Sequence, residues 1–228
     1  MNILVVVAHP DDEVLGCGGT IARHVQQGDR VAVIILAEGV TSRAAKRALD
    51  QDAEKLQALA AATHRACGIL GVDEITLNDF PDNRMDSLPL LDIVKVIEQH
   101  MNRLQPTVVY THHGGDVNVD HRVTYQAVVT ACRPQPENSV KTLLTFETSS
   151  STEWQPPLVG TPFAPNWFVD IGETLAAKLK ALSVYETELR SWPHPRSIQA
   201  VEHLARWRGS TVGVEAAEAF VLARNIID

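Results

Sequence analysis

The sequence has no apolar run near the ~18 residues that a helix needs to cross a bilayer, and it has no tract of basic residues. Its formal net charge of −8 at pH 7 has the wrong sign for a surface that binds nucleic acid or anionic lipid. The first residues also lack the positively charged segment and cleavage site of a signal peptide. We therefore expect a cytoplasmic protein with no membrane span and no nucleic-acid partner.

Cysteine is scarce as well, with three residues in 228 and no Cys-x-x-Cys pair. An odd, widely spaced set argues against a disulfide framework and indicates free thiols in a reducing compartment. Cys17 lies in the stretch G-C-G-G-T (16–20), which we interpret as a tight turn that leads into a helix. This stretch lacks the lysine and the spacing of a Walker A loop, and it matches no full dinucleotide-binding fingerprint.

Segments typical of buried strands alternate with helix-like segments, which is the pattern of βαβ units. The predicted strands span residues 3–7, 31–36, 74–77, 107–111, 142–147 and 168–171. The predicted helices span residues 20–27, 43–70, 90–104 and 174–189, with a further helix-compatible stretch before residue 132 and two more up to residue 228. The expected fold is a single α/β domain over residues 1–228 with a Rossmann-like, mostly parallel sheet flanked by helices. The long loop at 149–166 is a candidate lid.

An imidazole and three carboxylates directly follow the first predicted strand, at His9, Asp11, Asp12 and Glu13. Ligands bind at the carboxyl ends of the strands in an open parallel sheet. Adjacent acids repel one another unless a cation neutralises them. The cluster therefore predicts a divalent metal held by His9 and one or more of the acids.

A second polar cluster, T-H-H-G-G-D-V-N-V-D-H-R (111–122), follows the predicted strand 107–111 and should open at the same edge of the sheet. Imidazole and carboxylate ligands from two such loops suit zinc, with one coordination position left for water. Zinc lowers the pKa of bound water to about 7. A nearby uncoordinated carboxylate can then take the proton and return it to a leaving group.

The motifs A-H-P-D-D-E (8–13) and N-x-D-H-R (118–122) together resemble the LmbE/PIG-L family of zinc-dependent de-N-acetylases. The stretches F-P-D-N-R (80–84), S-S-S-T-E-W (149–154), H-P-R-S (194–197) and A-E-A-F (217–220) extend the resemblance over most of the chain. It implies an LmbE-like fold and hydrolysis of an N-acetyl group from an amino sugar or glycoconjugate. A homo-oligomer is a further expectation, since relatives often form one.

The resemblance also implies roles for particular residues. One Zn²⁺ per chain is expected on His9, Asp12 and His121, and Asp11 is expected to act as general base on the metal-bound water. Asp120 matches the acid of the family's D-H pair and should orient an imidazole, as metal-bound histidines usually require.

Asn118 stands where many relatives carry a histidine that stabilises the oxyanion. Asparagine can donate a hydrogen bond but cannot be a cation, and the loss of one oxyanion donor costs about 3 kcal/mol. Asn118 can thus be an oxyanion or substrate contact, or a turn residue. His112, His113 and His194 are candidates to compensate for the missing histidine.

Six further side chains are candidates for contacting the substrate. Arg43 and Arg84 are arginines that can lie beside the substrate, and Asp116 can bind sugar hydroxyls or stabilise its own loop. Trp154 can stack on a pyranose ring, and His113 and His194 are the two remaining candidates. Two other functions stay open, a metal-dependent phosphoesterase and a zinc-loaded sugar-binding protein with weak turnover.

Overall fold

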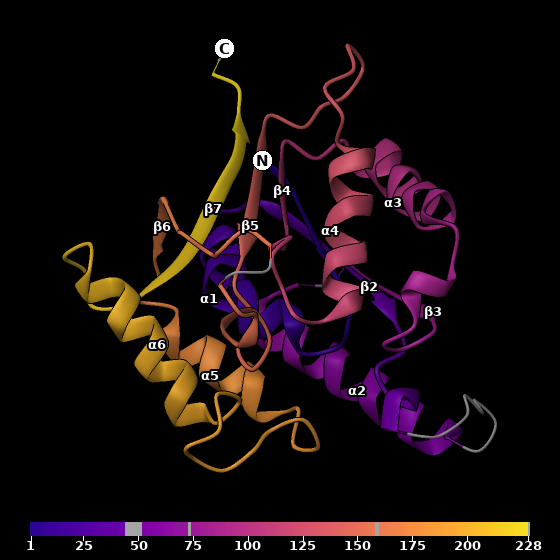
Figure 1. The fold of residues 1–228 in the computed structure, drawn as a ribbon. Coiled ribbons are helices and arrows are strands. Elements are labelled where there is room, and N and C mark those ends of the chain that lie inside the picture. Colours follow the sequence, from indigo (N-terminus) through magenta and orange to yellow (C-terminus); the bar gives the residue numbers. More distant parts are fainter. Residues whose placement is uncertain (44–51, 73, 158–159, 228) are drawn as a thin grey trace.

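Seven strands form one mixed sheet in the computed structural model, which describes residues 1–43, 52–72, 74–157 and 160–227 (Figure 1). They are β1 (Asn2–Val7), β2 (Arg30–Ala37), β3 (Glu74–Phe80), β4 (Val108–His112), β5 (Thr142–Phe146), β6 (Trp167–Asp170) and β7 (Ala217–Asn225). In the order β3-β2-β1-β4-β5-β7-β6, the first five strands are parallel and β7 is antiparallel to both of its neighbours. The predicted Rossmann-like, mostly parallel α/β fold is confirmed. A single domain over residues 1–228 stays a prediction.

The helices of the described residues lie on both faces of this sheet. They are α1 (Asp12–Gln26), α2 (Ala53–Leu70), α3 (Leu90–Leu104), α4 (Val119–Ala131), α5 (Leu175–Ser183) and α6 (Ile198–Ser210). Helices α1, α2 and α5 pack on one face, and α3 and α4 pack on the other (Figure 1). Short 3₁₀ helices lie in the loops after β2, β3 and β5: η1 (Thr41–Arg43), η2 (Met85–Ser87) and η3 (Thr152–Trp154). No helix among the described residues is both long and apolar enough to cross a membrane.

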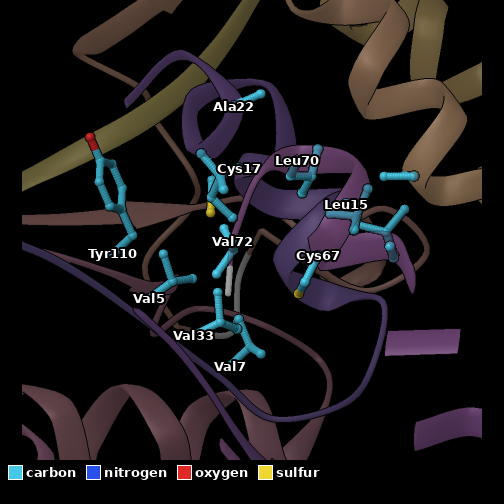
Figure 2. Close-up of a cluster of buried hydrophobic side chains, with 14 of the residues drawn as sticks. Val5, Val7, Leu15, Cys17, Ala22, Val33, Cys67, Leu70, Val72 and Tyr110 are labelled. Atoms are coloured by element: carbon cyan, nitrogen blue, oxygen red, sulfur yellow. The ribbon is translucent and has the colours of Figure 1, made fainter. Parts of the chain in front are cut away.

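The two covered faces explain why β1 is apolar at almost every position. Alternate side chains of a strand point to opposite faces of the sheet. Val5 and Val7 therefore pack toward α1 and α2, in the same buried cluster as Cys17 and Cys67 (Figure 2). Leu4 and the other alternate side chains of β1 pack toward α3 and α4. A strand covered on both sides has no polar face, so the first predicted strand has a clear signal.

The interpretation of residues 16–20 as a tight turn was wrong. Helix α1 begins at Asp12 and continues through these glycines, with a kink at Cys17 (φ −148°, ψ 26°). A Cβ atom built on Gly16 would lie 2.2 Å from the ring of Phe146, and one on Gly19 would lie 2.8 Å from Ile171. The glycines are required because other elements pack directly against the helix backbone.

The prediction that the chain ends in helices was also wrong for its last segment, which is the strand β7. Alanine and glutamate in this stretch favour a helix by local propensity, but tertiary pairing overrides propensity. Glu218 of β7 is buried, where it accepts hydrogen bonds from the backbone N–H groups of Gly19 (2.9 Å) and Thr20 (2.7 Å) and from Nζ of Lys178 (2.6 Å). The predicted helix over 174–189 ends at Ser183, and part of the predicted helix over 43–70 lies outside the described residues.

Candidate active site

Polar side chains gather at the carboxyl edge of the parallel sheet, where four strands end. His9 and Asp12 follow β1, Asp82 follows β3, His112 ends β4, and His121 lies in the first turn of α4. The loop after β5 closes this cluster from one side, because its Ser151 and Thr152 bond to Asp116. The expected convergence of the two polar clusters at one edge of the sheet is thus present.

Three of these residues form a group that can hold a metal ion. His9, Asp12 and His121 each offer one ligand atom, and all three atoms lie within 4.8 Å of one another. Nδ1 of His9 and Nε2 of His121 are each 3.3 Å from Oδ2 of Asp12. Oδ1 of Asp12 and Nε2 of His121 are buried without a hydrogen-bond partner. Buried polar atoms are normally satisfied, and this donor set suits zinc, so the residues fit the expected ion.

A second possible group, His9 with Asp82 and Asp120, is less suited to a metal. Asp120 accepts hydrogen bonds from the backbone N–H groups of Met85 (2.9 Å) and Asn83 (2.6 Å), so both of its oxygens are engaged. Nε2 of His9 lies 3.0 Å from Asp120. A carboxylate can only accept there, so this contact places the proton on Nε2 and leaves Nδ1 of His9 free toward Asp12.

Asp116 contacts the outer nitrogen of His121, as Asp120 contacts that of His9. Its Oδ1 is 3.2 Å from Nδ1 of His121, and it accepts hydrogen bonds from the hydroxyl groups of Ser151 and Thr152. The backbone N–H of Asn118 donates to the same carboxylate (2.8 Å). Because Asp116 is fully buried with both oxygens engaged, its placement does not support the predicted contact with a substrate.

The charges around this group favour a cation. Although burial raises the pKa of Asp12, the imidazoles of His121 and His112 hold it well below its usual value. Burial lowers the pKa of His121, but Asp12 and Asp116 outweigh this effect and raise it to about 9. Carboxylates that stabilise a proton on an imidazole would equally stabilise a metal ion in its place.

His112 lies beside His121 but is not available as a ligand. Its ring stacks on that of His121, with centroids 3.9 Å apart. Nε2 accepts a hydrogen bond from the backbone N–H of Ala8 (3.0 Å), and Nδ1 is 3.1 Å from Oγ1 of Thr148. Burial, and then the neighbouring His121, lower the pKa of His112 to about 4, so its ring is neutral at neutral pH.

Asp11 lies next to the group without belonging to it. Its backbone has a φ of 100°, rare for a residue with a side chain, and its N–H donates to Oε2 of Glu13 (3.1 Å). Nη1 of Arg196 is 3.1 Å from Oδ2 of Asp11. Burial raises the pKa of Asp11 to about 7, against the opposing effect of Arg196. Burial also raises the pKa of Glu13 to about 8, and Glu13 accepts a hydrogen bond from the hydroxyl of Tyr185 (2.5 Å).

Asn118 is the N-cap of α4. Its Oδ1 accepts from the backbone N–H groups of Asp120 (2.8 Å) and His121 (3.4 Å), and its Nδ2 donates to Asn83 (3.0 Å). Asparagine is among the residues preferred at this position. The structure thus uses Asn118 to begin the helix that carries His121.

The remaining predicted residues are scattered. His113 turns away from the metal-binding group, since its Nε2 is 2.9 Å from the carbonyl oxygen of Thr161. Arg84 is exposed, and the side chain of Arg43 lies outside the described part of the structure. Trp154 and His194 contact each other, with ring centroids 5.8 Å apart.

Sequence reasoning missed Arg196, Asp82 and Tyr185 as members of this site. Arg196 and Asp82 lie within H-P-R-S and F-P-D-N-R, the motifs that carried the family resemblance, so a signal for them was present. Tyr185 lies in a segment predicted to be helical and carried no such signal.

A cavity of about 630 Å³ lies between α2 and the segment that follows α5. Its walls include Leu59, Arg65, Tyr185 and Glu188, and Oε2 of Glu188 lies 3.8 Å from Nη1 of Arg196. Sites for small molecules usually measure about 300–1,000 Å³. The cavity therefore has the size of a small-molecule site, and Glu188 connects its wall to Arg196.

The fold and the site together define an α/β protein that carries a His/Asp metal-binding group at the carboxyl edge of a largely parallel sheet. The chain belongs to the PIG-L (LmbE-like) family: the family model described as GlcNAc-PI de-N-acetylase matches residues 4–132, which include His9, Asp11, Asp12, Asp120 and His121.

Individual relatives extend this likeness over most of the chain. The uncharacterized deacetylase YaiS of Escherichia coli is 31% identical over 192 residues, which cover 82% of this chain and 91% of the relative. The 1D-myo-inositol 2-acetamido-2-deoxy-alpha-D-glucopyranoside deacetylase of Mycolicibacterium gilvum is 27% identical over 265 residues, which cover 98% of this chain and 91% of the relative. Among solved structures, N,N'-diacetylchitobiose deacetylase from Pyrococcus horikoshii has the same fold, with a TM-score of 0.78 at 20% identity over 97% of this chain and 83% of that one.

A relative with different chemistry is 4-oxalmesaconate hydratase of Pseudomonas putida. It is 35% identical over 131 residues, which cover 53% of this chain and 47% of the relative. Membership of the family therefore establishes the scaffold, whereas the reaction depends on the residues of the site.

Proposed function

We propose that the protein is a zinc-dependent hydrolase that removes the N-acetyl group of an amino sugar or glycoconjugate. The observation that carries this proposal is a pair of buried atoms without a hydrogen-bond partner, Oδ1 of Asp12 and Nε2 of His121, next in sequence to Asp11, a carboxylate that is not part of the metal-binding group. A metal-binding group with an adjacent carboxylate that is not a ligand suits hydrolysis by activated water. The names of the family and of the deacetylase relatives support an acetamido sugar as the substrate.

Zinc, when bound, supplies a Lewis acid that polarises the amide carbonyl and makes water acidic enough to act near neutral pH. His9, Asp12 and His121 would hold it, and Asp120 and Asp116 fix the two imidazoles from behind. Asp11 takes the proton of the attacking water and returns it to the departing amine. This proton transfer is the role that the family resemblance implies for it.

Arg196 keeps Asp11 in place and puts a positive charge directly beside the proposed base. Its guanidinium is half-buried between Asp11 and Glu188, and Nε donates to Oγ of Ser150 (2.8 Å). Since Asn118 is engaged in capping α4, Arg196 is our candidate for the charge that the missing histidine would supply. Preorganised donors of this kind are worth about 3 kcal/mol each.

Hydration of a double bond is the second candidate, because of the hydratase relative. The same base and metal group could add water to an unsaturated acid, so product analysis has to separate the two reactions.

The test combines metal analysis with a screen of N-acetylated sugars for released acetate and free amine. We expect one zinc per chain and amine release from at least one acetamido sugar. The Asp11→Asn variant should keep its zinc and lose turnover by about 100- to 10,000-fold, the usual contribution of a general base. Release of phosphate from esters, or hydration of an unsaturated acid without any deacetylation, would refute the proposal. Sugar binding without any product would identify a binding protein instead.

A further inference from the structure

The backbone of Asp11, the proposed base, has a conformation that its own sequence does not favour. Asp11 is the N-cap of α1, with φ 100° and ψ −27°, in the left-handed region. Residues with a side chain rarely adopt this region and persist there when the surrounding structure holds them. An aspartate at an N-cap normally bonds the first free N–H groups of its helix, but the carboxylate of Asp11 makes no such bond. Contacts other than capping therefore have to hold this residue.

Glu13 makes the first of these contacts. Its Oε2 accepts a hydrogen bond from the backbone N–H of Asp11 (3.1 Å). A glutamate at the third position of a helix bonds the N-cap N–H in the same manner in a capping box, whereas Glu13 does so from the second position. Glu13 is fully buried, so the bond lies in a low-dielectric environment where it is stronger than in water. The place of the Glu13 carboxylate thus fixes the backbone of Asp11.

Tyr185 fixes the other oxygen of Glu13. Its hydroxyl donates to Oε1 of Glu13 (2.5 Å) across a sequence separation of 172 residues. The ring of Tyr185 is fully buried in the main hydrophobic cluster, where close packing keeps side chains in one rotamer. Tyr185, Glu13 and Asp11 therefore form a continuous chain of hydrogen bonds that runs from the core to the backbone of the proposed base.

The turn that carries Tyr185 also acts on Asp11 from a second side. The backbone N–H of Glu188 donates to the carbonyl oxygen of Tyr185 (2.9 Å), which holds the two residues in one turn. Oε2 of Glu188 lies 3.8 Å from Nη1 of Arg196, and the same Nη1 lies 3.1 Å from Oδ2 of Asp11. One turn of the chain thus reaches the backbone of Asp11 through Glu13 and its carboxylate through Arg196.

This turn is also part of the wall of the 630 Å³ cavity, since Tyr185 and Glu188 both line it. Gly39 lines the cavity as well and packs against the residue before Asp11: a Cβ atom built on Gly39 would lie 2.8 Å from Cδ of Pro10. Three wall residues therefore contact direct neighbours of Asp11. Replacing Tyr185 by phenylalanine would keep the ring in this wall and remove only the hydroxyl.

We propose that Tyr185, acting through Glu13, is a positioning residue for Asp11. The hydroxyl and the Glu13 carboxylate hold the left-handed backbone, which leaves the carboxylate of Asp11 free of the helix and against Arg196. The inference rests on the proposed function only where it calls Asp11 the base, because the positioning itself does not depend on the reaction. A displacement of a reacting group by about 1 Å can slow a reaction about 100-fold, so loss of a hydroxyl that never touches the substrate should lower turnover.

The hold on Asp11 can be measured without turnover, as hydrogen exchange of its backbone N–H followed by NMR. Tyr185→Phe and Glu13→Gln should each speed this exchange by about tenfold or more, the usual effect of losing one buried hydrogen bond. The double variant should exchange no faster than the faster single variant, because both changes break the same chain of contacts. The matched control is Tyr110→Phe, which removes another buried tyrosine hydroxyl, 2.9 Å from Nε2 of His24, and should leave the exchange at Asp11 unchanged.

Steady-state kinetics on an acetamido sugar that the wild type hydrolyses give the second readout. Tyr185→Phe should lower kcat by about 10- to 100-fold and leave KM unchanged, since the base is misplaced while the cavity wall is kept. Tyr110→Phe should change neither value. A higher KM with unchanged kcat would make Tyr185 a substrate contact and overturn the positioning role.

The two readouts separate this inference from the proposed function. Unchanged exchange at Asp11 in Tyr185→Phe, or an equal acceleration in Tyr110→Phe, would overturn the positioning role even if the wild type releases acetate. Faster exchange confined to the Tyr185 and Glu13 variants would support it even if no sugar is deacetylated, in which case the proposed function fails alone. If Tyr185→Phe does not fold, Glu13→Gln decides by the same measurements.

Discussion

Replacing Asp120 by asparagine tests whether the acid behind His9 fixes the metal-binding geometry. Its carboxylate is fully buried and accepts three N–H groups, from Nε2 of His9 (3.0 Å) and from the backbones of Asn83 (2.6 Å) and Met85 (2.9 Å). An amide offers one oxygen and one NH₂ group in the same space. Whichever way the amide is placed, its NH₂ group faces at least one N–H donor.

The structure sets the size of the effect. A hydrogen bond to a charged group contributes about 1.5–3 kcal/mol, so Asp120→Asn should lower the free energy of unfolding of the metal-free protein by about that amount. Residues that orient a metal-bound histidine typically change metal affinity by about 10- to 100-fold. Each tenfold loss corresponds to about 1.4 kcal/mol. We expect zinc to bind Asp120→Asn more weakly within this range, because His9 is no longer held with Nδ1 toward Asp12.

Zinc affinity is measured by competition with a chromophoric chelator, and stability by urea unfolding of the metal-free protein. Asp86→Asn on η2 is the matched control, because the same chemical change is made at an exposed position nearby. If Asp120→Asn binds zinc as tightly as the wild type while Asp86→Asn is also unchanged, Asp120 does not orient a ligand and the reasoning is refuted.

Three further predictions concern the core. Gly16→Ala places a Cβ atom 2.2 Å from the ring of Phe146 and should lower the free energy of unfolding in urea by about 1–3 kcal/mol. Gly68→Ala is the control: its Cβ atom meets open space on helix α2, so it should raise the free energy of unfolding by about 0.5–1 kcal/mol. Equal effects of the two substitutions would contradict the packing argument. Lys178→Met leaves the buried Glu218 without its cation and should lower the free energy of unfolding by about 3–5 kcal/mol. A decrease below about 1 kcal/mol, which is typical of exposed ion pairs, would contradict this prediction. Burial raises the pKa of all three buried thiols above the usual value, to about 12 at Cys132, so the native protein carries almost no thiolate near neutral pH. A thiol reagent should label none of the three thiols, Cys17, Cys67 and Cys132, in the native protein and all of them after unfolding. Any fast-reacting thiol in the native protein would disprove this prediction.

Much of the parallel half of the sheet could be predicted from residue pattern alone. Strands β1 and β2 are covered on both faces, so they are apolar at almost every position and stand out from the helices between them. Strand β7 could not be predicted in the same way. Its alanines and glutamate are helix formers, and its place between β5 and β6 depends on partners more than 40 residues away along the chain.

In the candidate site, too, some residues could be predicted from the sequence and others could not. His9, Asp12 and His121 were accessible to sequence reasoning because ligands follow the ends of strands and because the motifs are specific to a family. Arg196 and Asp82 lie in motifs that carried the resemblance, but they were not recognised as site residues because no periodicity describes the path of their loops. The structure brings Arg196 to within 3.1 Å of Asp11 across a sequence separation of 185 residues.

By itself the sequence determined the fold class, the edge of the sheet that carries the chemistry, and the residues that can hold a metal there. The fold class and the edge of the sheet follow from local rules, the period of apolar residues and the ends of parallel strands, whereas the particular metal ligands follow from the resemblance to a family. Only the tertiary structure decided how these residues are used. It makes Asn118 a helix cap, places Asp116 and Asp120 behind the imidazoles, and sets Arg196 against Asp11. The physical reason is that a side chain's partners at hydrogen-bond distance depend on where whole elements pack, which no local pattern records.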